Sequence, residues 1–128
     1  MSSKPPRHPV TPEVRETFKL QVQEWAAKLV PGWRVGVSDI PHKRYAAEVV
    51  KFDTASMLAH IKLGTDLGGA PTSDENIEAL AFHEVCHIFL HRYGELMADP
   101  HASQEAKNAA EHEVIHILTK LFIPGSDI

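Results

Sequence analysis

Apolar residues recur at intervals of three and four along three stretches of the chain, and this spacing predicts three amphipathic helices. We expect the helices at residues 11–30, 73–93 and 103–122. Thr11, which is followed by proline and glutamate, is a start signal for the first helix, and Ser103 can cap the last one. For the middle helix, Thr72 or Ser73 is the predicted cap, and Gly94 should end it.

Three shorter apolar or alternating runs predict strands. They lie at Trp33–Ser38, Ala47–Phe52 and Met57–Leu63. The short segment Asp53–Ser56 between the last two runs predicts a hairpin. The expected fold class is α+β, with an N-terminal helix, a small and mainly antiparallel three-stranded sheet with a hairpin, and two further helices. His42 and His60 fall in a loop and on a strand, where we expect exposed histidines rather than ligands.

The composition indicates one folded domain without a nucleic-acid or membrane partner. A chain of 128 residues with 43% hydrophobic residues can bury one modest core, so residues 11–128 should form a single domain after a Pro-rich, disordered leader at residues 1–10. The net charge of -4 and the scattered basic residues argue against nucleic-acid binding. No apolar run is long enough to span a membrane, and a secretory signal is missing. We therefore expect a cytoplasmic monomer whose lone Cys86 packs in the core.

The chemistry of the chain concentrates in the run His83-Glu84-Val85-Cys86-His87, which has the pattern H-E-x-x-H. On a helix, positions i and i+4 lie one turn apart on the same face, so His83 and His87 can offer two imidazole nitrogens to one metal ion. A zinc ion held by these and one further protein ligand keeps a fourth position for water, whose pKa it lowers to about 7. Glu84 is then placed to take the proton as the water attacks a carbonyl.

A second copy of the pattern, His112-Glu113-Val114-Ile115-His116, lies on the last predicted helix. The apolar residues of that helix form one stripe, and His112 and His116 point mostly away from it, which indicates a solvated face. Around the first copy, apolar residues occur on nearly every side of the helix, which predicts that this helix is buried. Two histidines and a glutamate in a buried helix need partners, and a metal ion satisfies all three. Hydrogen-bonded core histidines are the alternative.

The last predicted helix should supply the third metal ligand. Glu111 falls within about 40° of the centre of the apolar stripe, whereas Glu113 is about 120° away on its flank. Because a carboxylate on a buried stripe needs a cation, Glu111 is our first choice and Glu113 the second. An ion pair between Glu111 and Lys107 is the alternative. His91 lies two turns beyond His83 and is poorly placed to share its ion.

Together these residues resemble the small zincin-like metallopeptidases of the gluzincin kind, among them compact bacterial and phage-borne proteins of the ImmA/IrrE type. The resemblance rests on H-E-x-x-H on one helix and a glutamate on the next. It implies zinc as the cofactor, held by His83, His87 and Glu111. Glu84 would act as general base and later as proton donor. The resemblance also implies that the strand before the metal helix, Met57–Leu63, offers an unpaired edge to an extended peptide.

The sequence therefore predicts a zinc-dependent metallopeptidase that acts on a peptide or protein substrate. Two other interpretations stay open: a non-catalytic binding protein with a zincin fold that engages a protein partner, and a metal-free helical domain with coincidental histidines. The binding protein would show a saturable partner interaction without turnover. The metal-free domain would keep its thermal stability when a chelator is added. Manganese, iron or cobalt can occupy the same set of ligands. His101 is a further alternative for the third ligand.

Overall fold

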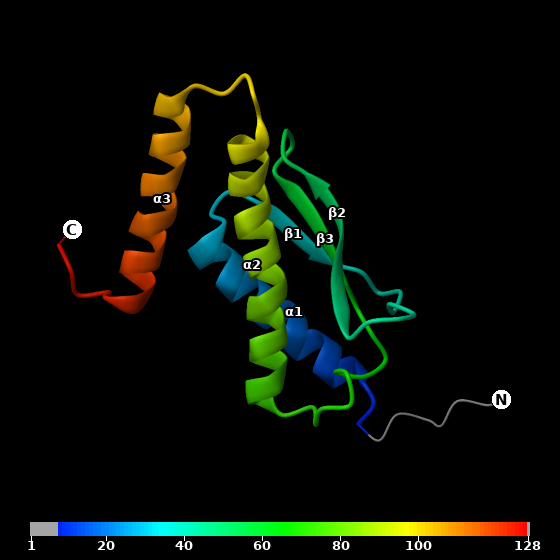
Figure 1. Ribbon diagram of the computed structural model, residues 1–128. Coiled ribbons are helices and arrows are strands. Elements are labelled where there is room, and N and C mark those ends of the chain that lie inside the picture. Colours follow the sequence, from blue (N-terminus) through cyan, green and yellow to red (C-terminus); the bar gives the residue numbers. More distant parts are fainter. Residues whose placement is uncertain (1–7, 128) are drawn as a thin grey trace. The chain divides into compact units, whose positions relative to one another are not determined.

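The protein consists of three helices and a small mixed sheet, as a computed structural model shows for residues 8–127 (Figure 1). In chain order the elements are α1 (Pro12–Leu29), β1 (Arg34–Val37), β2 (Ala47–Asp53), β3 (Leu58–Leu63), α2 (Asp74–Ala98) and α3 (Gln104–Phe122). The predicted α+β class and the order of the elements are confirmed. Each strand also begins and ends within one residue of its predicted boundary.

The first helix begins as its sequence signal predicts. Thr11 is the N-cap of α1, and its Oγ1 accepts the backbone N–H of Val14 at 3.2 Å. Most of the predicted leader, residues 1–7, lies outside the described residues. Val10, the last residue of the predicted leader, donates its N–H to the carbonyl of Thr65 at 2.9 Å. The chain therefore contacts the connection between β3 and α2 before α1 begins.

The sheet has the strand order β1-β3-β2, so β3 is its central strand. β2 and β3 form the predicted hairpin and pair antiparallel, whereas β1 pairs with β3 in parallel. The sheet is therefore mixed rather than mainly antiparallel. The connection 38–46 explains this order, because it follows β3, with His42 N–H donating to Leu63 O at 2.9 Å, and crosses the end of β3 before β2 begins.

The central place of β3 corrects the expectation of an unpaired edge at Met57–Leu63. Both sides of β3 are hydrogen-bonded to neighbouring strands, so a peptide cannot add to the sheet there. Within the described chain, β2 pairs with β3 alone and lies at one edge of the sheet, while β1 lies at the other. A peptide that extends this sheet must therefore join β1 or β2.

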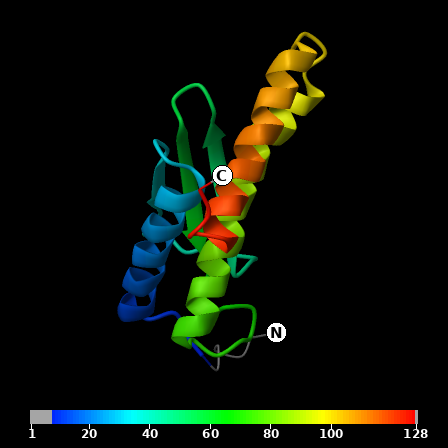
Figure 2. The ribbon, with the colours of Figure 1, turned by 90° about the vertical axis from the view of Figure 1, so that its left-hand side faces the viewer.

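The core lies between the sheet and the two helices that cover one of its faces, α1 and the first half of α2 (Figure 1, Figure 2). Alternate residues of β3, Ala59, Ile61 and Leu63, are fully buried on this face. The buried residues of the helices are Phe18, Val22, Ala26 and Leu29 in α1 and Ile77, Ala81, Glu84, Val85 and Ile88 in α2. Trp25 of α1 and Phe82 of α2 meet edge to face with centroids 4.7 Å apart, so the two helices also contact each other.

The middle helix, α2, begins at its predicted cap but ends later than predicted. Ser73 Oγ accepts the backbone N–H of Asn76 at 3.2 Å. The helix continues through Gly94 to Ala98, so the expected end at residue 93 is wrong. Gly94 does not adopt the positive φ of a helix-ending glycine. Glycine inside a helix costs about 1 kcal/mol relative to alanine, which a helix of this length tolerates.

Backbone contacts group the chain into two compact units, Met1–Ile88 and Phe89–Ile128. The first contains α1, the sheet and the start of α2, and the second contains the end of α2 and α3. Ser103 caps α3 as predicted, with its Oγ accepting from Ala106 N–H at 3.0 Å, but no residue of α3 is buried. The single domain expected for residues 11–128 stays a prediction. Over the described range, no helix is long and apolar enough to cross a membrane.

Candidate metal centre

His83 and His87 lie on an exposed side of α2, one helical turn apart. Their Nε2 atoms are 3.2 Å from each other, and the rings meet edge to face with centroids 4.9 Å apart. Two nitrogens that bind one tetrahedral zinc ion at about 2.0–2.1 Å lie about 3.3 Å from one another. The observed spacing therefore fits a shared ion without any change of the helix backbone.

Glu84 lies between these histidines in sequence but is buried, with 4% of its surface exposed. Its Oε2 atom is enclosed and has no hydrogen-bond partner within the described chain. The ligand atoms of His83, Glu84 and His87 all lie within 4.8 Å of one another. A buried carboxylate oxygen is costly without a partner, and a cation held by the two histidines would relieve this cost. The donor set thus fits a divalent metal, and two imidazoles favour zinc.

The environment of Glu84 also alters its acidity. Burial raises the pKa of the Glu84 carboxyl above its ordinary value, because the charged form loses hydration. The neighbouring His87 and His83 act against this effect, and so does His42. The negative charge of Glu48 adds to it. Burial is the largest cause, so the pKa is raised on balance, and the carboxylate is a stronger base than an ordinary glutamate.

His42 and Glu48 form a pair near Glu84 that the sequence did not reveal. Nδ1 of His42 accepts the backbone N–H groups of Arg44 and Tyr45 at 3.0 and 3.1 Å, so it carries no hydrogen. Nε2 then holds the hydrogen and donates it to Glu48 Oε2 at 3.2 Å. His42 is therefore half-buried and hydrogen-bonded through both ring nitrogens, which corrects the expectation of an exposed loop histidine. The connection 38–46 has no periodic pattern that could have indicated this contact.

The surroundings of the histidines differ from the prediction of a helix buried on nearly every side. His83 and His87 are exposed, and Leu90 is 55% exposed. In the first unit a three-stranded sheet and one helix cover only one side of α2, so apolar residues on the other sides keep their solvent contact. The features that could hold a metal ion are the partnerless oxygen of Glu84 and the histidine spacing, which also suits a hydrogen bond between the two rings. Burial of the histidines is not one of them.

Glu111 lies on α3 in the second unit and is exposed. Within its own unit α3 buries none of its residues, because an amphipathic pattern shows only which face could pack. The role of Glu111 as third ligand stays a prediction, as do those of Glu113 and His101. His112 of the second H-E-x-x-H copy is exposed, as predicted, and His116 is too.

Comparisons with known proteins provide no relative for this centre. No family model, no curated protein and no solved structure matches the chain. What the group of His83, Glu84 and His87 can do therefore has to be inferred from its own geometry and chemistry, and the resemblance to zincin-like metallopeptidases stays a prediction.

Proposed function

We propose that the protein is a zinc-dependent metallopeptidase with its centre at His83, Glu84 and His87. One observation carries the proposal: two exposed imidazole nitrogens 3.2 Å apart lie beside a buried carboxylate oxygen that has no partner among the described residues. The first feature suits a shared zinc ion, and the second suits a base next to it. The order of the elements, with the H-E-x-x-H helix after a hairpin and before another helix, supports a zincin-like fold.

Each residue of the centre has its own part in the proposed reaction. His83 and His87 hold the metal from one turn of α2. A bound zinc ion supplies Lewis-acid chemistry, since it lowers the pKa of water to about 7 and polarises a carbonyl group. Glu84 takes the proton of the attacking water and passes it to the amine nitrogen that leaves. The burial that raises the pKa of Glu84 helps the carboxyl to keep this proton until the amine receives it.

The substrate is proposed to lie along β2. Glu48 belongs to β2, and its charge acts on Glu84, so β2 rather than β1 is the edge strand beside the centre. An extended peptide can join such an edge through main-chain hydrogen bonds while its scissile bond reaches the metal. This placement replaces Met57–Leu63, whose hydrogen bonds are already used within the sheet.

The third metal ligand is proposed to be Glu111, with Glu113 and His101 as the alternatives. A catalytic zinc ion generally has three protein ligands and an open position, and the first unit supplies two histidines. Glu111 and Glu113 are carboxylates on the helix that follows α2, which is where the resemblance to gluzincins implies the missing ligand.

Metal content tests the centre directly. Protein purified without a histidine tag should contain about one zinc ion per chain by elemental analysis, and His87→Ala should lose it. His116→Ala is a matched control, because it removes the corresponding histidine of the second H-E-x-x-H copy, and it should keep its zinc. A parent protein that neither contains zinc nor takes it up would contradict the proposal.

Activity tests the role of Glu84. Glu84→Gln should retain zinc and lower the rate of hydrolysis of an unfolded protein substrate by about 10²- to 10⁴-fold, the range for loss of a general base. Glu78→Gln removes the same charge from an exposed position of α2 and should leave the rate unchanged. If the zinc-loaded parent shows no turnover but binds a protein partner saturably, the non-catalytic zincin-fold protein becomes the better interpretation.

A further inference from the structure

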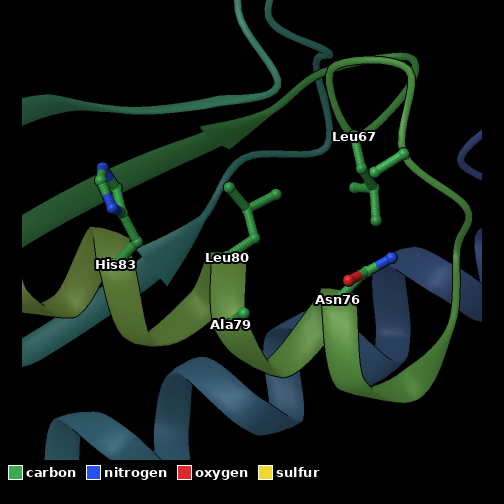
Figure 3. A pocket seen from close by; sticks show the side chains of 6 residues that line it. Leu67, Asn76, Ala79, Leu80 and His83 are labelled. Atoms are coloured by element: carbon green, nitrogen blue, oxygen red, sulfur yellow. The ribbon is translucent and has the colours of Figure 1, made fainter.

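A small apolar pocket lies beside His83, toward the start of α2 (Figure 3). The residues that line it are Leu67, Ala70, Asn76, Ala79, Leu80 and His83. Its volume is about 300 Å³, which is at the lower end of the range of about 300–1,000 Å³ for ligand pockets. A space of this size suits one large side chain rather than an extended ligand.

The wall opposite α2 is held in place by the turn that follows β3. Asp66 Oδ1 accepts the backbone N–H groups of Gly68 and Gly69 at 2.7 and 3.0 Å. Both glycines have a positive φ, at 70° and 87°, which other residues adopt at a cost. Leu67 and Ala70 pair across this turn. In Figure 3 the side chain of Leu67 projects from the turn toward the helix, so the pocket is formed before a ligand arrives.

Asn76 gives the pocket an oriented polar group at the end away from His83. Its Nδ2 donates to the carbonyl of Pro71 at 2.9 Å, which fixes the direction of the amide. The oxygen consequently lies on the side of Leu80, as Figure 3 shows, and accepts no hydrogen bond from residues 8–127. Apolar side chains thus line the space between His83 and Asn76, and a hydrogen-bond acceptor lies at its far end.

We propose that this pocket receives a tyrosine side chain of the substrate, with the ring between Leu67 and Leu80 and the hydroxyl donating to Asn76 Oδ1. The inference rests on the proposed function, because it requires the substrate backbone to be held at a metal on His83. His83 and Asn76 are seven residues apart on α2, which is about 10 Å along the axis. An aromatic side chain with a terminal hydroxyl can bridge most of this length.

The lining favours tyrosine over other large side chains. Phenylalanine would fill the apolar walls but leave the oxygen of Asn76 without a donor. Lysine has a donor at its tip, but the lining contains no carboxylate to pair with its charge. Selection at this pocket therefore comes from apolar contact together with one hydrogen bond.

The test uses N-acylated amino-acid hydroxamates, because a hydroxamate binds zinc and directs the adjoining side chain into the neighbouring pocket. Glycine, phenylalanine, tyrosine and lysine hydroxamates are titrated into the zinc-loaded protein by calorimetry. We expect the phenylalanine probe to bind at least about 10-fold more tightly than the glycine probe, from burial of the ring. The tyrosine probe should bind about fivefold more tightly again, from the hydrogen bond. The lysine probe should gain little over glycine.

Two variants separate the contributions of the walls and of Asn76. Ala79→Leu fills the pocket from an exposed helical position and should remove the advantage of both aromatic probes while glycine hydroxamate still binds. Ala27→Leu adds the same side chain to an exposed position of α1 that does not line the pocket, and it should change nothing. Asn76→Ala should equalise the tyrosine and phenylalanine probes and leave the affinity for phenylalanine within about twofold of the parent.

The outcomes distinguish this inference from the proposed function. If glycine hydroxamate binds but the aromatic probes gain nothing, or if Ala79→Leu leaves their advantage intact, the pocket proposal is overturned and the metal centre stands. A lysine probe that binds more tightly than tyrosine would also overturn it. If glycine hydroxamate does not bind at all, the metal centre fails and the inference fails with it.

Discussion

At the level of single residues, Glu84 is the charged side chain that the described structure buries. It is 4% exposed, one of its oxygens has no hydrogen-bond partner in the described chain, and burial raises its pKa. In the metal-free protein the ionised carboxylate therefore opposes folding, because the unfolded chain hydrates the same charge fully. A zinc ion on His83 and His87 would remove this cost by supplying an opposite charge.

Replacing Glu84 by glutamine should stabilise the metal-free protein at neutral pH. Below the ordinary glutamate pKa, about 4.3, the carboxyl is neutral in both states and the change has little effect. As the pH rises above this value, the unfolded chain releases the proton first, so the parent loses stability that the variant keeps. We expect a gain of about 1 kcal/mol at pH 7, or about 4 °C in melting temperature, in melting curves recorded with a chelator.

The exposed Glu78 on the same helix provides the control for this experiment. Glu78→Gln removes an equal charge where water already solvates it, and it should show no gain that grows with pH. Parallel curves for Glu84→Gln and the parent between about pH 4 and pH 7 would mean that Glu84 is not buried as the structure shows.

Gly64 is the residue on which the connection between β3 and α2 depends. A Cβ atom there would collide with the carbonyl oxygen of Tyr45 and lie 3.2 Å from that of Ala46, and neither backbone atom can move freely. Gly64→Ala should lower the free energy of unfolding by about 2 kcal/mol or more, measured by urea denaturation. Gly125→Ala, where a Cβ has no neighbour within 4 Å, should stay within about 0.5 kcal/mol of the parent.

At the level of elements, α2 is longer than its sequence signals indicated, and Gly94 lies inside it. Gly94→Ala should therefore stabilise the protein by about 0.5–1 kcal/mol, because alanine loses less backbone entropy and a Cβ there meets nothing within 4 Å. Circular dichroism should show a higher melting temperature with unchanged helix content. A loss of stability would instead place Gly94 at the helix end, where its positive φ would strain alanine.

Local signals predicted most element boundaries, and long-range contacts account for the errors. Thr11 and Ser103 mark helix starts because a cap acts on residues two or three positions away. The place of β3 in the sheet could not be deduced in this way. A hairpin establishes that β2 and β3 are neighbours, but the position of β1 depends on how the connection 38–46 crosses the end of β3.

For the whole molecule, local sequence signals predict one part of the candidate site, and long-range contacts decide the other part. The spacing of His83, Glu84 and His87 on one helix was sufficient to predict that their ligand atoms converge. The pair of His42 and Glu48 was not predictable, because it depends on backbone hydrogen bonds within an irregular connection. Nor does periodicity show which side of α2 is covered, since apolar residues occur on nearly all of its sides. Packing alone decides this, and it buries Glu84 while leaving both histidines exposed.

Zinc binding should stabilise the whole protein, and the choice of third ligand can be measured through it. Zinc at about 100 times its dissociation constant should add about 2.7 kcal/mol to the free energy of unfolding, and a chelator should remove this gain.

Loss of a residue that only hydrogen-bonds a metal ligand lowers metal affinity by about 10- to 100-fold. Glu111→Ala should weaken zinc binding by more than this if Glu111 is itself a ligand. Glu105→Ala, at an exposed position on the same helix, should bind zinc as the parent does. If Glu111→Ala behaves like Glu105→Ala in a competition titration against a fluorescent chelator, the same comparison with Glu113→Ala and His101→Ala decides between the remaining ligands.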